Sequence, residues 1–174
     1  MAADAIIVGG GSGARFGQKK QFVCLGETPL LKRAVACFET HGSVRSIVIV
    51  VPEEDIPLAR ELLSGTTKPL SFAKGGSTRQ ESVSNGLSLL KESEYVLIHD
   101  AVRPFVTGEL ISRVLSGMEY FDACIPGLAV TNTLKEVSGD LVVRTVPRSN
   151  VYGIQTPQCF RTERIVAAHS WARR

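Results

Sequence analysis

A short apolar run that leads directly into a glycine-rich loop constrains the fold of this chain more than any other feature. Residues 5–8 form an apolar run long enough for one buried strand, and residues 9–17 contain five glycines. Because glycine adopts positive φ easily and lets the backbone approach a ligand, successive N–H groups of such a loop can converge on an anion. Arg15, Lys19 and Lys20 add cationic side chains. The loop therefore suits a nucleoside triphosphate.

A glycine-rich loop of this kind has three other interpretations. The Gly-x-Gly-x-x-Ala spacing at residues 9–14 matches the loose form of a dinucleotide fingerprint, but no acidic residue follows at the end of a second strand, about 20 residues on. A P-loop is excluded because Gly17 is followed by Gln-Lys rather than by Lys-Ser or Lys-Thr. A glycine-rich turn with solvated charges and no ligand stays open.

Predicted strands and helices alternate after the loop. Apolar runs predict strands at residues 46–51, 69–73, 95–99 and 122–126, and the segments between them carry apolar residues at helical spacing. Strands joined by helices form a parallel sheet with right-handed crossovers, so the sequence predicts a doubly wound, mostly parallel α/β fold. Ligands in such sheets bind beyond the carboxyl ends of the strands, where the glycine-rich loop, Gly75, Gly76 and Asp100 all fall.

The pattern changes near residue 129. Residues 131–137 and 141–146 flank Ser138-Gly139-Asp140 and predict a β-hairpin with a three-residue loop. A two-stranded arm is marginally stable alone, so this one, at about residues 129–151, is expected to rest on another surface. Residues 1–174 as a whole are expected to form a single domain.

Composition argues against several classes of protein. A hydrophobic content of 44% allows a proper core, while a net charge of +3 with scattered basic residues gives nucleic-acid binding little support. The four cysteines are isolated and form no C-x-x-C pair, which predicts reduced thiols rather than a zinc site. No apolar run approaches the length of a membrane span and residues 1–8 do not resemble a signal peptide. We therefore expect a cytoplasmic protein that does not bind membranes.

Several motifs together resemble those of a known enzyme family. Gly-x-Gly-x-Arg-Phe at residues 11–16, followed by Lys-Gln-Phe at 20–22, resembles the signature of sugar-nucleotide-type nucleotidyltransferases. It is most similar to the 2-C-methyl-D-erythritol 4-phosphate cytidylyltransferase family of the non-mevalonate isoprenoid pathway. His-Asp-Ala-Val-Arg-Pro-Phe at 99–105 and Gln-Thr-Pro-Gln at 155–158 also match. The family usually has Ala-Ala-Gly where this chain has three glycines at 9–11, and proline where it has Lys19.

The resemblance implies transfer of a cytidylyl group from CTP to 2-C-methyl-D-erythritol 4-phosphate, with Mg²⁺, in a homodimer whose subunits exchange their arms. It implies that Lys20 holds the α-phosphate and stabilises the transition state, and that Arg15 grips the β- and γ-phosphates. Asp100 is the implied metal ligand. The implied CTP-binding residues are Gly9, Gly10, Gly11, Gly13, Gly76, Ser82 and Asp100, and the implied acceptor-binding residues are Arg103, Thr133 and Arg148.

Other residues of the same motifs are interpreted as support for the site. His99 could act as a general base, but a phosphate monoester needs no base to attack CTP, so we assign His99 a structural role. Arg79 is interpreted as a brace for the turn at 75–76, and residues 155–158 as structural support.

Two alternative functions stay open. Ribitol 5-phosphate cytidylyltransferases share the motifs at 99–105 and 155–158. The stretches Asn-Thr-Leu-Lys at 132–135 and Thr-Val-x-Arg at 145–148 argue against that family. Family members usually continue beyond the point where this sequence ends, with a Thr-Asp-Asp/Glu stretch and an Asn-Ile-Lys-x-Thr motif that supplies a second catalytic lysine. We therefore expect either a fragment or a variant without that part, and a catalytically inactive nucleotide-binding domain is the second alternative.

Overall fold

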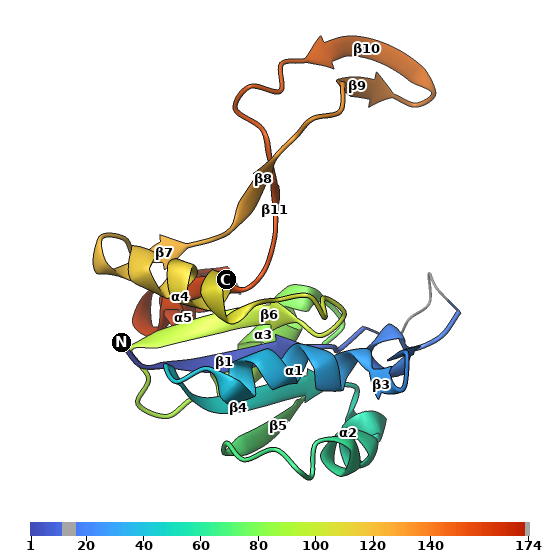
Figure 1. The fold of residues 1–174 in the computed structure, drawn as a ribbon. Coiled ribbons are helices and arrows are strands. Elements are labelled where there is room, and N and C mark those ends of the chain that lie inside the picture. Colours follow the sequence, from blue (N-terminus) through green and yellow to red (C-terminus); the bar gives the residue numbers. More distant parts are fainter. Residues whose placement is uncertain (12–16, 173–174) are drawn as a thin grey trace.

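A six-stranded sheet forms the centre of the computed structural model, which describes residues 1–11 and 17–172 (Figure 1). Its strands stand in the order β5-β4-β1-β6-β12-β7. The parallel strands are β1 (Ala3–Val8), β4 (Val44–Val51), β5 (Leu70–Lys74) and β6 (Tyr95–Asp100). An antiparallel strand, β12 (Gln158–Arg161), lies between β6 and β7 (Ala123–Cys124). The predicted doubly wound, mostly parallel sheet is confirmed.

Helices cover both faces of this sheet (Figure 1). Side chains alternate along β1, so that Ala5 and Ile7 face one core and Ile6 faces the other. The first core is closed by α1 (Leu30–Thr40), α2 (Ile56–Leu62) and α4 (Gly108–Ser116). The second is closed by α3 (Arg79–Leu87) and α5 (Thr162–Trp171). Burial on both faces explains why the central strands are almost uninterrupted apolar runs.

Short elements complete the connections between these layers. In the described part of the chain, the single-turn 3₁₀ helices are η1 (Lys20–Phe22), η2 (Glu53–Asp55) and η3 (Gly117–Glu119). A two-stranded turn before α1 is made by β2 (Cys24–Leu25) and β3 (Thr28–Pro29). Within the described ranges, every helix is too short or too polar to span a membrane.

A long β-arm projects away from the sheet (Figure 1). Its stalk pairs β8 (Gly127–Ala129) with β11 (Tyr152–Ile154), and its tip pairs β9 (Leu134–Ser138) with β10 (Leu141–Val146). Ser138 pairs directly with Leu141, so the predicted three-residue loop is wrong: the turn has two residues, with Gly139 at a φ of +57°.

His99 is buried at the carboxyl end of β6. Its Nδ1 lies 2.8 Å from the hydroxyl of Thr156, and its Nε2 lies 3.0 Å from the carbonyl oxygen of Arg103. A neutral imidazole with its proton on Nε2 satisfies both contacts, because it accepts from Thr156 and donates to Arg103. Its ring centroid is 5.0 Å from that of Phe38. Burial lowers the pKa of His99 to about 4, so the ring stays neutral at physiological pH.

Acidification should destabilise the protein through His99. The unfolded chain protonates this residue near pH 6.5 and the folded protein near pH 4, so between these values the unfolded state binds more protons. The free energy of unfolding should therefore fall as the pH is lowered through this window, by at most about 3 kcal/mol. Urea unfolding at pH 7 and pH 4.5 measures the fall. The variant His99→Gln, whose amide can still donate to Arg103, should lose less stability on acidification; equal losses in both proteins would contradict the assignment.

Candidate functional site

Three loops meet at the carboxyl edge of the parallel strands. They begin at Gly9 after β1, at Gly75 after β5 and at Ala101 after β6. The N–H group of Gly9 donates to the carbonyl of Val50 over 2.7 Å, and that of Gly75 donates to the carbonyl of Val51 over 2.8 Å. Each loop therefore starts from a fixed point on its neighbouring strand, as ligand-binding loops of open α/β sheets do.

The backbones of Gly10 and Gly75 approach so closely that neither position has room for a side chain. A Cβ atom on Gly75 would lie 2.8 Å from the Cα atom of Gly10, and one on Gly10 would lie 2.8 Å from Oγ of Ser82. A Cβ atom on Gly9 would lie 3.0 Å from that of Ala101. Gly11, in contrast, has no described atom within 4 Å of such a position. Gly10 and Gly75 thus let the loop after β1 touch the turn after β5, and Gly11 borders the open side of the site.

Ser82 braces the turn that carries Gly76. Its hydroxyl accepts from the N–H group of Gly76 over 3.0 Å and donates to the carbonyl of Thr78 over 2.9 Å. The Thr78 hydroxyl in turn accepts from the N–H group of Glu81 and caps α3. Ser82 is buried and its hydroxyl is engaged within the turn. A contact from Ser82 or Gly76 to a nucleotide base stays a prediction.

Asp100 holds two arginines at the end of β6. Its Oδ1 accepts from Nε and Nη2 of Arg79 over 3.1 and 3.0 Å, and its Oδ2 accepts from Nε of Arg103 over 3.0 Å. Nη1 of Arg103 also donates to the side-chain oxygen of Gln155. The loop after β6, the start of α3 and the segment before β12 are thereby tied together. Both guanidinium groups remain partly exposed, so they are accessible to a phosphate group.

Asp100 is also the predicted metal ligand, and the structure limits what it can hold. Both of its oxygens accept hydrogen bonds from guanidinium groups. Across residues 1–11 and 17–172, no group of three or more His, Cys, Asp or Glu side chains could hold a metal ion. Mg²⁺ commonly takes one or two carboxylates together with phosphate oxygens and water. A lone carboxylate therefore fits a magnesium ion that a triphosphate brings, rather than one that the protein holds by itself.

The residues after the glycine-rich loop supply further cations. Lys20 is the first residue of η1 and is exposed. Nζ of Lys19 lies 2.9 Å from Oε1 of Glu54 and 2.7 Å from Oδ2 of Asp55, and these hydrogen bonds raise the pKa of Lys19. Gln21 is buried, and its amide donates to the carbonyl of Gly11 over 3.5 Å. The other two predicted residues of this loop, Gly13 and Arg15, lie outside the described residues.

The structure does not bring the two predicted arm residues to this site within one chain. Thr133 and Arg148 are exposed on the arm, and Nη1 of Arg148 donates to the carbonyl of Thr131. The arm points away from the sheet (Figure 1). Lys20 follows the loop after β1, and Arg103 lies in the loop after β6, both at the carboxyl edge of the sheet.

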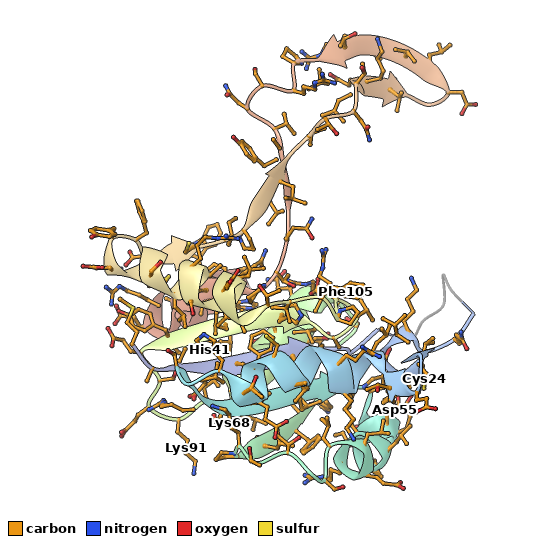
Figure 2. The ribbon with its side chains drawn as sticks, in the orientation of Figure 1. Cys24, His41, Asp55, Lys68, Lys91 and Phe105 are labelled. Carbon is orange, nitrogen blue, oxygen red and sulfur yellow. The ribbon has the colours of Figure 1, made fainter. Side chains whose placement is uncertain are left out.

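A cavity of about 720 Å³ adjoins Arg103 on the side of α4 and the stalk. Its polar lining comes from His99, Arg103, Arg113, Gln155 and Thr156, and most of the apolar lining comes from the loop after β6, α4, β7 and the start of the stalk. Phe105, which is 80% exposed, lies at its rim near the base of the arm (Figure 2). None of the glycines of the site lines this cavity; of the three loops, only the one after β6 reaches it, through residues 102–106.

Sequence reasoning missed two sets of contacts in the site. The acids at 53–55 follow a predicted strand and Pro52, a pattern typical of a helix start, but the structure shows that Glu54 and Asp55 also bind Lys19. Sequence reasoning gave residues 155–158 a supporting role, without finding that Gln155 binds Arg103 and Thr156 binds His99. A run of acids directly after a strand that neighbours β1 was the available signal for the first set.

Comparisons with known proteins agree with this geometry. The family model of 2-C-methyl-D-erythritol 4-phosphate cytidylyltransferase (IspD) matches residues 3–174. A bifunctional enzyme IspD/IspF of Bartonella tribocorum is 37% identical over 176 residues, covering 98% of this chain and 44% of that protein. A 2-C-methyl-D-erythritol 4-phosphate cytidylyltransferase of Bacillus cereus is 37% identical over 172 residues, covering 97% of this chain and 76% of that protein.

A solved structure shows the same fold. The 4-diphosphocytidyl-2C-methyl-D-erythritol synthase of Anaerococcus prevotii superposes with a TM-score of 0.87 at 29% identity, over 98% of this chain and 74% of that one. The chain spans less than half the length of the bifunctional relatives and about three quarters of the length of the Bacillus relative. Since the family model matches almost every residue and the relatives align along the whole sequence, the chain belongs to the 2-C-methyl-D-erythritol 4-phosphate cytidylyltransferase (IspD) family.

Proposed function

We propose that the protein transfers a cytidylyl group from CTP to 2-C-methyl-D-erythritol 4-phosphate, giving 4-diphosphocytidyl-2-C-methyl-D-erythritol and pyrophosphate. The observation that carries this proposal is the junction of three loops at the carboxyl edge, where Gly10 and Gly75 touch, in a chain of this family. A nucleotide fits such an edge because backbone N–H groups and fixed guanidinium groups converge there.

The proposed reaction needs positioning and charge stabilisation more than covalent help. An oxygen of the acceptor's phosphate attacks the α-phosphorus of CTP, a new P–O bond forms, and the bond to the β-phosphate oxygen breaks. Negative charge on the α-phosphate oxygens is stabilised by the ammonium group of Lys20, and Arg15 binds the leaving pyrophosphate. No general base is required, which agrees with the buried, neutral state of His99.

Arg103 is proposed to bind the phosphate of the acceptor. Its guanidinium group is held by Asp100 and Gln155, and its carbonyl by His99. A guanidinium group fixed in this way can bind a phosphate with two parallel hydrogen bonds at a small cost in side-chain entropy. Arg79, held by the other oxygen of Asp100, adds positive charge beside it.

We further propose Mg²⁺ as the cofactor. When bound, the ion neutralises charge on the triphosphate and polarises its oxygens. Asp100 would hold it on the side of the protein, at the end of β6, where one guanidinium group must first release a carboxylate oxygen.

A homodimer formed through the arm is part of the same proposal. Thr133 and Arg148 cannot serve the site of their own chain while the arm points away from it, so they would serve the site of a second copy. Leu141, Val142 and Val143 of the arm are exposed, and burying them against a partner would stabilise an otherwise marginal two-stranded tip. We also propose a cytoplasmic location, which four free cysteines support.

The first experiment measures pyrophosphate release from CTP and 2-C-methyl-D-erythritol 4-phosphate. Turnover should depend on Mg²⁺ and stop with EDTA. Lys20→Ala should lower kcat by about 100-fold or more, because it removes a cation from the transition state. Its thermal unfolding should be unchanged, since Lys20 is exposed.

Three results would contradict this proposal in different ways. A preference for ribitol 5-phosphate would identify the other cytidylyltransferase. CTP binding without turnover on either acceptor would indicate a catalytically inactive nucleotide-binding domain. An unchanged kcat in Lys20→Ala would remove that residue from the mechanism.

Arg148→Ala should raise the KM for the acceptor by about 10- to 100-fold. This range corresponds to the free energy that a hydrogen bond to a charged group contributes. The KM for CTP should stay within about two-fold, because Arg148 belongs to the acceptor side of the proposed site. Steady-state kinetics with each substrate varied in turn measure both values. Arg144→Ala, on the same arm but paired with Glu136, is the matched control and should change neither. A selective loss of CTP affinity in Arg148→Ala would contradict the arm assignment.

Sedimentation velocity should show a dimer. Mixing inactive Lys20→Ala protein with Arg148→Ala protein should restore activity at subsaturating acceptor, because a mixed dimer has one site with both an intact Lys20 and an intact partner arm. A monomer, or a mixture whose rate is only the average of its two components, would overturn the exchange of arms.

A further inference from the structure

We propose that Lys19 is a positioning residue, which ties the end of the glycine-rich loop to the acidic turn η2 and thereby fixes the neighbouring Lys20. The inference rests on the proposed function, because it assigns Lys20 to the α-phosphate. It concerns a position where this chain carries a charged side chain that links the end of the glycine-rich loop to the turn after β4.

The topology places these two segments side by side. β1 and β4 are parallel neighbours in the sheet, and Val8 pairs with Val50 near their carboxyl ends. The chain leaves β1 through the glycine-rich loop and returns at η1, while β4 leads into η2. Asp55 appears in Figure 2 at the same end of the molecule as Cys24, which follows η1. Lys19 spans the distance between these segments with two short ion pairs.

The backbone transmits the tether to Lys20. Lys19 directly precedes η1, and its carbonyl accepts from the N–H group of Phe22 over 3.1 Å. The carbonyl of Lys20 accepts from the N–H group of Val23 over 3.0 Å. The loop before them is rich in glycine, which restrains the backbone less than any other residue. An anchor at Lys19 therefore limits how far the single helical turn that begins with Lys20 can shift.

The same contact offsets negative charge near the proposed triphosphate site. Glu53, Glu54 and Asp55 place three carboxylates in one turn at this edge of the sheet. Without Lys19, the two acids that it binds would repel an approaching nucleoside triphosphate. Lys19 is 32% exposed and Asp55 13% exposed, so the pair is only partly screened by solvent.

Folding should depend little on this contact. Ion pairs that water can reach contribute little to the free energy of unfolding. Catalysis is far more sensitive, because a displacement of about 1 Å in a positioned group can cost on the order of 100-fold in rate. The role of Lys19 should therefore appear in the kinetics and hardly at all in the stability.

Arg161 provides a matched control. It too is a cation between two carboxylates, with Nη1 3.3 Å from Oε1 of Glu94 and Nε 3.1 Å from Oδ1 of Asp122, and it is 33% exposed. Arg161 pairs with Tyr95, the first residue of β6, so it lies at the opposite edge of the sheet from the three loops.

The test compares Lys19→Met and Arg161→Met in the full chain. Lys19→Met should lower kcat by about 10- to 100-fold, raise the KM for CTP and leave the KM for the acceptor unchanged. Arg161→Met should keep all three constants. Exchange of the two charges in Lys19→Asp/Asp55→Lys should recover at least part of the loss, and both single variants should be worse than the exchanged pair.

A double-variant cycle with Lys20 decides whether Lys19 acts through its neighbour. In a Lys20→Met background, Lys19→Met should cause less than about three-fold further loss of kcat, because the group that it positions is gone. A full 10- to 100-fold loss in that background, or wild-type kinetics of Lys19→Met, would overturn the inference while leaving the proposed function intact. If the unmodified protein neither turns over nor binds CTP, the proposed function fails and the inference fails with it.

Discussion

The contact between the backbones of Gly10 and Gly75 is the constraint on which the site depends. Any side chain at either position would overlap with atoms less than 3.0 Å away, and the loop after β1 would separate from the turn after β5. That turn carries Gly76 and the braced Ser82. Two segments that are 65 positions apart in the sequence are thus joined by the absence of side chains, an arrangement that only glycine allows.

Among the described residues, several cations near this contact are paired with carboxylates. Asp100 binds Arg79 and Arg103, while Glu54 and Asp55 bind Lys19. A phosphate bound by Arg103, as proposed, would have to compete with Asp100, and its greater charge would favour the exchange. Gln155, which binds the same guanidinium group, would then keep Arg103 in place while its other partner changed. Preorganisation of this kind reduces the reorganisation that binding and reaction require.

The fold could be predicted from the sequence because its signals are local. Apolar runs and helical spacing gave the parallel strands and their helices, whereas the antiparallel insertion of β12 between β6 and β7 depends on pairing that no short stretch specifies. The hairpin was found, but its loop was one residue too long because Ser138 extends the ladder by one pair. Motifs supplied Asp100 and Arg103 as site residues. They could not supply the link from Lys19 to Asp55, since acids at a helix start already have a sufficient local explanation in the helix dipole.

The arm sets a different requirement from the loops. In the described structure it is joined to the sheet by the narrow stalk of β8 and β11, and its tip exposes Leu141 and Val142. A surface that covers these apolar side chains would also fix the direction of Arg148 on the same arm. If that surface belongs to a second copy, one contact both stabilises the arm and completes the acceptor side of the neighbouring site. Assembly and acceptor binding would then depend on the same residues, so neither could be lost without weakening the other.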